Sequence, residues 1–388
     1  MRRFMGWRVG VLLVVSSLIT AACSSGTSPS DLIQVREGHT ATLLENGQVL
    51  VVGGHGGQRV GLASPELFDP ATGWSPASAT SQAREEHTAT LLSDGRVLVA
   101  GGFSDTDPNP DILPPALASG ENFIAATNEV EVYDPSTNTW SPTGSMEEVR
   151  AGHTATLLKD GRVLVSGGSA GQAALGRPGL GEFVLASAEL YDPSTGIWSI
   201  TESMAEPRSG HSAILLADGR VLVIGGASAE AYDPSNDSWS SAGSMSEERE
   251  DHTATLLDDG RVLVVGGQEP DEGRVLASVE VFDPATGSWS AASAMEENRS
   301  DHAATLLDDG RVLIVGGEDA LAEAYSPVTD SWSRAGELRK ARGGFTATLL
   351  ADGRVLIAGG AGEGGERPSL TEVFDPTTNS WKPAAEQQ

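Results

Sequence analysis

The sequence is poor in residues on which several kinds of chemistry depend. Among its 388 residues there is one cysteine, Cys23, so the chain forms no internal disulfide and must be held together by packing. Only three lysines are present, Lys159, Lys340 and Lys382, which gives little support to Schiff-base catalysis. The chain also lacks a serine-nucleophile motif, a phosphate-binding loop and a zinc signature.

Basic residues are scarce as well. The chain has 25 Lys and Arg against 54 Asp and Glu, a formal charge of -29 at pH 7. Loss of residues 1–22 would remove three arginines and no acid, leaving 22 basic and 54 acidic side chains and a charge of -32. Such a balance argues against nucleic acid as a partner. The acids are spread through the chain, which is typical of a soluble surface.

Long apolar runs are absent after the first 22 residues. There, three arginines precede the run VGVLLVVSSLIT, which is short for a membrane span and is followed by Ala-Ala-Cys. This order resembles the signal of bacterial lipoproteins. The resemblance implies a signal peptide at 1–22 and a lipidated Cys23 that anchors the protein in a membrane, with a flexible tether over 23–31. Ser24 resembles the outer-membrane sorting pattern, so we expect an extracytoplasmic location at the outer membrane or cell surface.

One sixteen-residue pattern is present seven times. The stretch HTATLLSDGRVLVAGG at 87–102 recurs with small changes at 39, 153, 211, 252, 302 and 345. Two β-rich runs separated by Asp-Gly or Asn-Gly predict a hairpin whose turn needs positive φ angles. The second run is apolar on both faces and should be covered on both sides. It ends in two glycines that suit a bend or a close backbone approach. These are Gly53, Gly54, Gly101, Gly102, Gly167, Gly168, Gly225, Gly226, Gly266, Gly267, Gly316, Gly317, Gly359 and Gly360.

A third segment follows each pattern, as in EVYDP at 131, and leads through a turn to a tryptophan. Its proline ends the strand. Each unit therefore predicts a four-stranded antiparallel meander, and its aromatics should pack between neighbouring units. The tryptophans are Trp74, Trp140, Trp198, Trp239, Trp289, Trp332 and Trp381. All four tyrosines share the aromatic position of this segment, which makes them framework residues.

Seven such meanders cover their faces by stacking around an axis. Apolar strand, Gly-Gly, a spaced Tyr or Phe and then Trp resembles the Kelch repeat, and the resemblance covers residues 36–381. We therefore expect an all-β fold, a seven-bladed β-propeller of four-stranded antiparallel Kelch blades over residues 32–388, and a monomer. How the ring closes is left open.

A second motif, Arg-x-x-His, begins six of the seven units, whereas Arg342 is followed by Phe345. The imidazoles would form either a ring for a metal or anion, or structural groups that each hydrogen-bond their own blade. The structural interpretation is favoured because the motif repeats, because Phe serves in the seventh unit, and because ligands must lie within about 2 Å of a metal. No cofactor is expected.

The strand 2–3 loops and the links between blades should emerge on one side, the loop-rich face. These loops range from three residues at 227–229 to twenty-eight at 103–130, and binding sites favour such loops. Loops 103–130 and 169–188 are expected to form a lip over blades 2 and 3. The candidate ligand residues are His55, Arg59, Asp105, Asp107, Asp111, Glu121, Arg177, Glu182 and Phe183.

Three further interpretations concern this face. His55 is taken as a flexible, exposed histidine. The acids of DTDPNPD give a weak Ca²⁺ signal, because the spacing and glycine of an EF-hand loop are missing. The link acids beside the repeated arginines form either surface ion pairs or a polar rim suited to sugar or basic peptide. They are Glu85, Glu86, Glu147, Glu148, Glu247, Glu248, Asp251, Glu296 and Glu297.

Two classes of function follow from these patterns. The Kelch resemblance implies a binding or scaffolding protein that recognises protein or glycan through the loop-rich face. The alternative is a carbohydrate-active enzyme, hydrolytic or sugar-modifying, on the same face. Galactose-oxidase-like propellers need a cysteine crosslinked to tyrosine, which the mature chain lacks, so a copper radical oxidase is excluded. A sialidase-like nucleophile is disfavoured because every tyrosine belongs to the framework.

Overall fold

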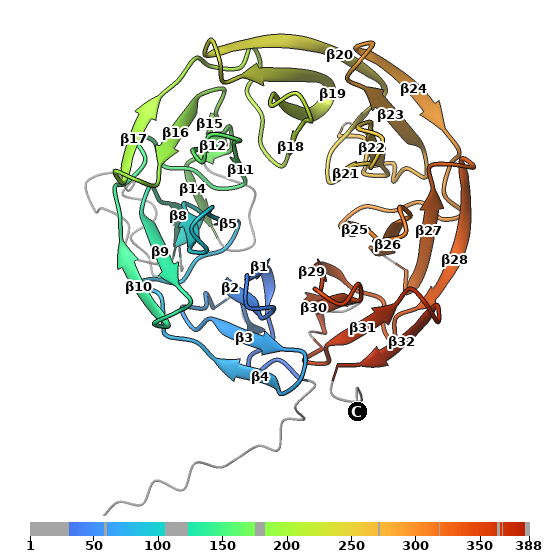
Figure 1. Ribbon diagram of the computed structural model, residues 1–388, viewed down its shortest axis with the longest axis horizontal. Helices are drawn as coiled ribbons and strands as arrows, with labels where there is room; N and C mark the ends of the chain where they lie inside the picture. The colour runs from blue at the N-terminus through green and yellow to red at the C-terminus, as the bar shows by residue number, and fades with distance from the viewer. Residues whose placement is uncertain are drawn as a thin grey trace, which may run out of the picture.

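The computed structural model describes residues 31–57, 60–104, 123–174, 183–270, 272–317, 319–362, 365–366 and 368–384. Among these residues, seven β-sheets are arranged radially around an axis, so the predicted seven-bladed propeller is confirmed (Figure 1). The same residues form two smaller sheets in the loops, one of two strands and one of three. Cys23 and residues 1–30 lie outside the described residues, and the signal and tether remain predictions. Among the described residues, no helix has the length and apolar character needed to cross a bilayer.

Each blade is built from one continuous stretch of the chain, and its first strand lies nearest the axis (Figure 1). Blade 1 contains β1 (Glu37–Leu43), β2 (Val49–His55), β3 (Glu66–Asp69) and β4 (Gly73–Pro76). Blade 2 contains β5 (Thr88–Leu91), β6 (Val97–Ala100), β9 (Val130–Asp134) and β10 (Thr139–Pro142). Blade 3 contains β11 (Thr154–Leu157), β12 (Val163–Ser166), β16 (Ala188–Asp192) and β17 (Ile197–Ile200).

The remaining blades repeat this order. Blade 4 contains β18 (Ser212–Leu215), β19 (Val221–Asp233) and β20 (Ser238–Arg249); β19 includes both middle segments because the loop between them is short. Blade 5 contains β21 (Thr253–Leu256), β22 (Val262–Val265), β23 (Val279–Asp283) and β24 (Ser288–Ala292). Blade 6 contains β25 (His302–Leu306), β26 (Val312–Gly316), β27 (Leu321–Ser326) and β28 (Ser331–Glu337). Blade 7 contains β29 (Gly343–Leu349), β30 (Val355–Ala361), β31 (Glu372–Asp375) and β32 (Ser380–Pro383).

The second strand of each blade contributes to two hydrophobic cores. Val97 and Val99 of β6 pack toward blade 1, whereas Leu98 and Ala100 of the same strand pack toward blade 3. All four are at most 1% exposed. Alternate residues of a strand point to opposite faces, so a strand buried between two neighbours must be apolar at every position. This explains the continuous apolar runs.

The aromatic residues join each blade to the one before it. The Tyr133 and Trp140 rings lie 5.0 Å apart in blade 2, and the same stack occurs in all seven blades. The Trp140 indole also donates to the Ser78 carbonyl of blade 1 at 2.9 Å and packs against the core of that interface. The predicted packing between blades is therefore confirmed.

The hairpin turns differ from the prediction in one respect. In blade 2, Leu92 donates to Arg96 and Gly95 donates back to Leu92, so the loop holds three residues. Only Gly95 has a positive φ, at 83°, whereas Asp94 does not. This is a type I turn followed by a left-handed glycine, and the aspartate instead accepts a hydrogen bond from the Arg96 backbone. The glycine was thus assigned correctly, but the aspartate was not.

The ring closes without exchange of a strand between its ends. Blades 1 and 7 are each built from their own consecutive strands. They meet through a shared core and through the Trp74 indole, which donates to Thr371 at 3.0 Å. Residues 31–35 add an arm: Asp31 pairs with Leu370, and Leu32 donates to the Ser369 carbonyl at 2.9 Å. Leu32 is 1% exposed, so the arm is part of the packed molecule.

Candidate binding face

The described ends of the two loops that were expected to form a lip over blades 2 and 3 pair with each other. Loop 103–130 contributes β7 (Phe103–Ser104) and β8 (Phe123–Ala126), and β8 pairs with β14 (Gln172–Ala174) from the blade 3 loop. The blade 3 loop also holds β13 (Ser169–Ala170), which pairs with β15 (Phe183–Val184). Two loops far apart in sequence therefore share one small sheet on the loop-rich face.

Of the predicted ligand residues, the structure describes only Phe183 and His55. Phe183 lies exposed in β15, with 71% of its surface open to solvent. His55 is buried, as described below. The others lie outside the described residues: Arg59, Asp105, Asp107, Asp111, Glu121, Arg177 and Glu182.

The repeated arginines are buried anchors. Of the link acids that were expected to form either surface ion pairs or a polar rim, Glu148 and Glu247 form ion pairs with Arg150 and Arg249. Arg249 is fully buried and donates to the Gly266 carbonyl at 2.9 Å and to the Glu280 carboxylate at 3.0 Å. An arginine in each blade makes the same two contacts, to the first glycine of its Gly-Gly pair and to the glutamate that begins its third segment. The ion pairs are Arg36–Glu66, Arg84–Glu131, Arg150–Glu189, Arg208–Glu230, Arg249–Glu280, Arg299–Glu323 and Arg342–Glu372. In such places removal of one partner leaves an uncompensated buried charge.

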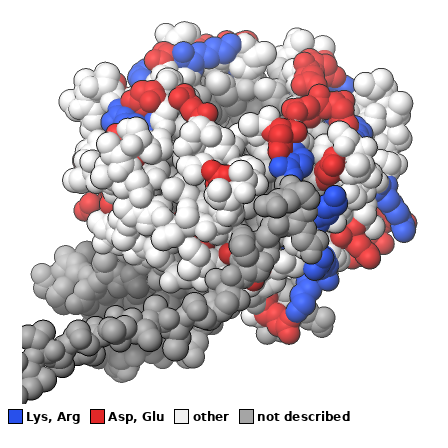
Figure 2. Space-filling model, turned by 60° about the horizontal axis from the view of Figure 1, so that its bottom comes forward, with Lys and Arg blue, Asp and Glu red and all other residues white. Residues whose placement is uncertain are grey.

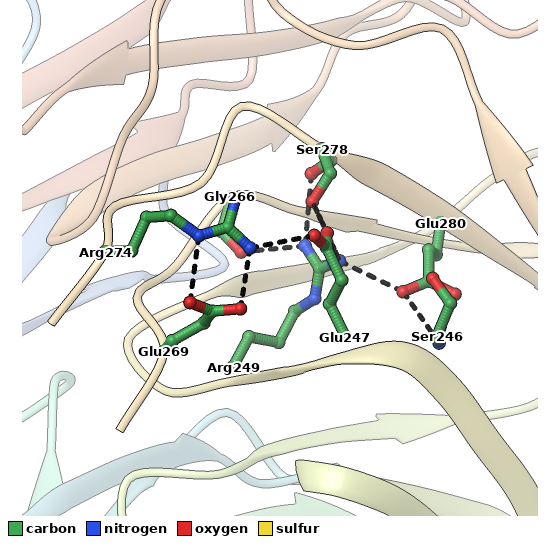
Figure 3. Close-up of polar contacts among 8 residues, drawn as sticks. All are labelled: Ser246, Glu247, Arg249, Gly266, Glu269, Arg274, Ser278 and Glu280. Carbon is green, nitrogen blue, oxygen red and sulfur yellow. Dashed lines mark hydrogen bonds and ion pairs between the residues drawn. The ribbon is translucent and has the colours of Figure 1, made fainter. Parts of the chain in front are cut away.

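Each anchor fixes the link strand against its own blade. The Glu280 carboxylate also accepts the Ser246 backbone N–H at 2.9 Å, so one glutamate holds two points of the link (Figure 3). This glutamate was not among the residues predicted to matter. Its recurrence seven times, in step with the arginine, was the available signal.

Blade 5 extends its anchor to the surface (Figure 3). Glu247 accepts hydrogen bonds from Arg249 and Ser278 and also forms an ion pair with Arg274 at 3.1 Å. Arg274 in turn pairs with both carboxylate oxygens of Glu269 at 2.6 and 2.9 Å. The Arg274 side chain is 54% exposed, so the outer part of this network adds little to stability.

Five of the six histidines of the repeat bond to the preceding blade, not to their own as expected. His252 is the exception: the equivalent residue of blade 4 is Ser212, and no hydrogen bond from a described residue reaches its Nε2. His87 Nε2 lies 3.0 Å from the Thr40 hydroxyl of blade 1. The same pairing joins Thr88 to His153, Thr154 to His211, Thr253 to His302 and Thr346 to His39. Burial, and then the neighbouring Arg84, lower the pKa of His87 to about 3, so this imidazole is neutral at pH 7. The rings thus fasten blade to blade.

The exception in blade 7 follows the same rule. Blade 6 precedes blade 7 in the ring, and its residue equivalent to Thr40 is Ala303. Alanine offers no hydroxyl, and blade 7 has Phe345 where the other blades have histidine. The Phe345 ring would lie 2.2 Å from a Cβ placed on Gly316, which shows that it occupies the histidine position. A polar pair is therefore replaced as a unit by an apolar pair.

His55 differs from the flexible, exposed histidine that the sequence suggested. It ends β2, is 8% exposed, and lies between two carboxylates. Its Nδ1 is 2.5 Å from Glu85 and its Nε2 is 3.5 Å from Glu37. Hydrogen bonds to Glu37 and then Glu85 raise the pKa of His55 to about 9, so it is an imidazolium at neutral pH. The imidazolium links the first two blades near the axis.

The two residues between Arg and His or Phe of each motif, here called the axial pairs, precede the innermost strands on the loop-rich face. The second member always has a left-handed φ: Gly38, Glu86, Gly152, Gly210, Asp251, Asp301 and Gly344. Gly152 donates to the Glu86 carbonyl at 3.0 Å and Gly210 to that of Gly152 at 3.1 Å, so neighbouring pairs contact each other. Six of the fourteen axial residues are acidic and none is basic.

The described residues contain no group of three or more His, Cys, Asp or Glu side chains arranged to hold a metal. Each tyrosine is stacked on the tryptophan of its own blade. What distinguishes the loop-rich face is therefore its varied loops and its acidic axial pairs, mounted on a repeated frame.

Comparison with known proteins agrees with this architecture. The family model for the KLHDC2/KLHL20/DRC7 Kelch-repeats domain matches residues 12–226, 117–317 and 188–360. Among curated proteins, spermatocyte protein spe-26 of Caenorhabditis elegans is 31% identical over 113 residues, 28% of this chain and 18% of the relative. Kelch-like protein 36 of Rattus norvegicus is 32% identical over 108 residues, 28% of this chain and 16% of the relative.

A plant relative and a solved structure complete the comparison. The F-box/kelch-repeat protein At1g67480 of Arabidopsis thaliana is 33% identical over 103 residues, 26% of this chain and 24% of the relative. The matches thus span a quarter or less of these relatives. A fungal alcohol oxidase of the AA5 family in complex with copper superposes with a TM-score of 0.68 at 20% identity, covering 90% of this chain and 74% of that one. At this identity the likeness concerns the fold alone.

Proposed function

Because this chain belongs to the family of Kelch-repeat propellers, we propose that it is a protein-binding scaffold that recognises its partner through the loop-rich face. The observation that supports this most directly is the contrast between the two faces. Seven repeated blades present short three-residue hairpins on one side, and loops of up to twenty-eight residues on the other. Varied loops on a rigid frame are where binding sites are usually built.

We also propose that the protein is lipid-anchored outside the cytoplasm through Cys23. The order of basic, apolar and small residues before that cysteine supports this. The arm at residues 31–35 joins the ring on the loop-rich face, beside Ser369 and Leu370. Eight residue steps from Cys23 to Asp31 span at most about 28 Å. The anchor would therefore keep the loop-rich face near the membrane, where the partner must be accessible.

The location is tested by labelling cells with a palmitate analogue. Label on the wild-type chain that disappears in Cys23→Ser, together with protease sensitivity from outside the cytoplasm, supports the anchor. Label that persists in Cys23→Ser, or protection of the chain behind the cytoplasmic membrane, contradicts it.

The binding role is tested by crosslinking and recovery of partners from the native membrane. Replacement of residues 103–130 by a short Gly-Ser link should abolish recovery of a specific protein while thermal melting is preserved. The matched control is a variant in which residues 285–287, in a turn on the opposite face, are replaced instead. This variant should still recover the partner. Equal recovery by both variants would contradict the proposal. Binding and turnover of a glycan in a parallel screen would favour the enzyme alternative.

A further inference from the structure

A cleft of about 590 Å³ opens on the loop-rich face beside the axis, where blades 6, 7 and 1 meet. It is lined by the axial pairs of these blades together with nearby glycines. The lining residues that matter here are Glu37, Ser300, Asp301, Gly343, Gly344 and Arg342.

The cleft exists because blade 7 differs from the other six. Its motif reads RGGF, the only copy with glycine at both axial positions. A Cβ on Gly344 would lie 2.9 Å from Cγ of Glu37, and a Cβ on Gly343 would lie 3.2 Å from Cβ of Asp301. Two carboxyl-bearing side chains, one from each neighbouring blade, therefore border the space that the glycines leave.

The carboxylate of Asp301, at the edge of the cleft, is not neutralised by any other described residue. No hydrogen bond or ion pair from another described residue reaches the Asp301 carboxylate. Burial, and then the carboxylates of Asp251 and Glu37, raise its pKa. The cation that lines the cleft, Arg342, is committed to Glu372. Glu37, the second carboxylate that lines the cleft, pairs with the His55 imidazolium, which also pairs with Glu85.

The backbone conformation of Asp301 also distinguishes this position. Its φ is 51°, a left-handed conformation that is less favourable for a residue with a side chain than for glycine. Four of the seven blades place glycine at this position, which avoids the cost. Blade 6 instead places a carboxylate there, at the edge of the glycine-lined space.

Elsewhere the charges are mixed. On the part of the surface in Figure 2, Asp and Glu side chains lie beside Lys and Arg. The opposite face repeats this balance, since each of its six hairpin arginines pairs with an aspartate two residues earlier. The axial pairs, which are acidic only, depart from that pattern.

We propose that this cleft receives a lysine or arginine side chain of the partner protein, held between Asp301 and Glu37. The proposal rests on the protein-binding function above and names the chemistry of its partner. A metal ion is a poorer fit, because the described residues hold no group of three ligating side chains. A guanidinium or ammonium group needs only carboxylates and polar backbone around it, and an arginine donates to two carboxylates in a planar fork.

Short peptides test the cleft directly on the purified mature protein. Fluorescein-labelled nonapeptides of glycine and serine carry one central arginine, lysine or citrulline, and binding is followed by anisotropy at low salt. The arginine and lysine peptides should bind more tightly than the uncharged citrulline peptide. Asp301→Asn should weaken the binding of the arginine peptide about fivefold, since an ion pair of this kind is worth about 1 kcal/mol.

Two further variants distinguish binding in the cleft from attraction to the overall negative charge of the protein. Gly343→Lys places an ammonium group at the glycine step and should weaken peptide binding at least as much as Asp301→Asn. Asp258→Asn removes one exposed acid from the opposite face and should leave binding unchanged. Thermal melting of each variant shows that it is folded. Equal binding of the citrulline peptide, an unchanged affinity in Asp301→Asn, or an equal loss in Asp258→Asn overturns the proposal.

The peptide measurements and the replacement of residues 103–130 test the two proposals separately. A partner that is lost with residues 103–130 but keeps its affinity for Asp301→Asn leaves the scaffold function standing and removes the cleft from it. Failure to recover any partner removes the scaffold function, whereas the peptide measurements still decide whether the cleft binds a cationic side chain. Displacement of the arginine peptide by 1 mM Ca²⁺ alone, but not by Na⁺ of equal ionic strength, would mean a metal site and would also overturn the proposal.

Discussion

The Thr40 hydroxyl of blade 1 lies 3.0 Å from Nε2 of His87 in blade 2, and this contact crosses the boundary between two blades. Its counterpart between blades 6 and 7 is the apolar pair Ala303 and Phe345, where no hydrogen bond is possible. One molecule therefore contains two solutions for the same interface. The contact is structural, because it repeats at five of the seven blade boundaries and because its apolar version occupies the same position.

A double-mutant cycle tests whether the pair acts as a unit. We expect Thr40→Ala and His87→Phe each to lower the free energy of unfolding by about 1–2 kcal/mol, since each leaves a buried group without its partner. The double variant reproduces the natural Ala–Phe pair and should lose clearly less than the sum of the single variants. Urea unfolding measures all four proteins. Additive losses would mean that the two residues are not coupled.

The buried histidines predict a loss of stability in acid. The pKa of His39, His87, His153, His211 and His302 is lowered to about 3, mainly by burial, and that of His252 to about 4. The unfolded chain takes up these protons below about pH 6.5, whereas the folded chain does not. Each group should therefore cost up to about 1.4 kcal/mol of stability per pH unit as the pH falls below 6.5.

This is checked by urea unfolding at pH 7, 6 and 5, above the range where carboxylates dominate. His153→Phe should show a shallower dependence by about one proton, even if its stability at pH 7 is reduced. A slope that does not change in this variant would show that His153 is not the neutral, buried group described above.

His55 predicts the opposite behaviour in alkali. Its pKa is raised to about 9 by Glu37 and Glu85, above the value near 6.5 of an unfolded histidine. The stabilisation is thus complete below about pH 6.5 and is lost as the pH rises through 9, by about 1–3 kcal/mol in total. Thermal melting between pH 6 and 9.5 should show this decline. His55→Gln should remove it, and an unchanged decline in that variant would assign the effect to another group.

The sequence predicted the parts of the fold that repeat. Seven copies of one strand pattern indicate seven blades, and apolar residues at every position of the second strand indicate burial on both sides. Arg249 and Glu280 recur just as regularly, but they lie 31 residues apart, and the pattern does not say that they meet in the interior. Regular recurrence marks a residue as structural without naming its partner.

The contacts of the candidate site were harder to predict, because they do not repeat along the sequence. His55, Glu37 and Glu85 come from two blades and occur together once, so their contact depends on the closed ring and not on a local motif. The cleft at Gly343 and Gly344 is likewise the product of three adjacent blades. Closure of the ring by the arm at residues 31–35 involves segments more than 300 residues apart. Such contacts are set by tertiary packing, which periodicity does not encode.

The first glycine of the Gly-Gly pair in blade 1 should tolerate a side chain poorly. Gly53 has φ 66°, and a Cβ there would lie 2.4 Å from the Arg84 carbonyl and 2.5 Å from the His87 ring of blade 2. Gly47 in the same blade has φ 83° but no atom within 4 Å of its Cβ position. Gly47→Ala should therefore cost only the left-handed backbone, about 1–2 kcal/mol. Gly53→Ala should cost clearly more, and equal melting temperatures would contradict the proposed blade contact.

The last prediction compares the buried and the exposed part of the network in blade 5. Glu280→Ala removes the buried carboxylate of the Arg249 guanidinium and leaves only its longer contact to Glu247, at 3.4 Å. Burial already disfavours the charge of Arg249, as its lowered pKa shows. We expect a loss of about 3–5 kcal/mol, because the attraction disappears while the cost of desolvating the arginine remains. Arg274→Ala removes a half-exposed ion pair and should cost less than about 1 kcal/mol. Arg249→Met combined with Glu280→Leu removes both charges and should recover part of the loss, since no unpaired charge remains. Urea unfolding of the four proteins decides the matter: a loss in Glu280→Ala no larger than in Arg274→Ala would show that the anchor is not buried.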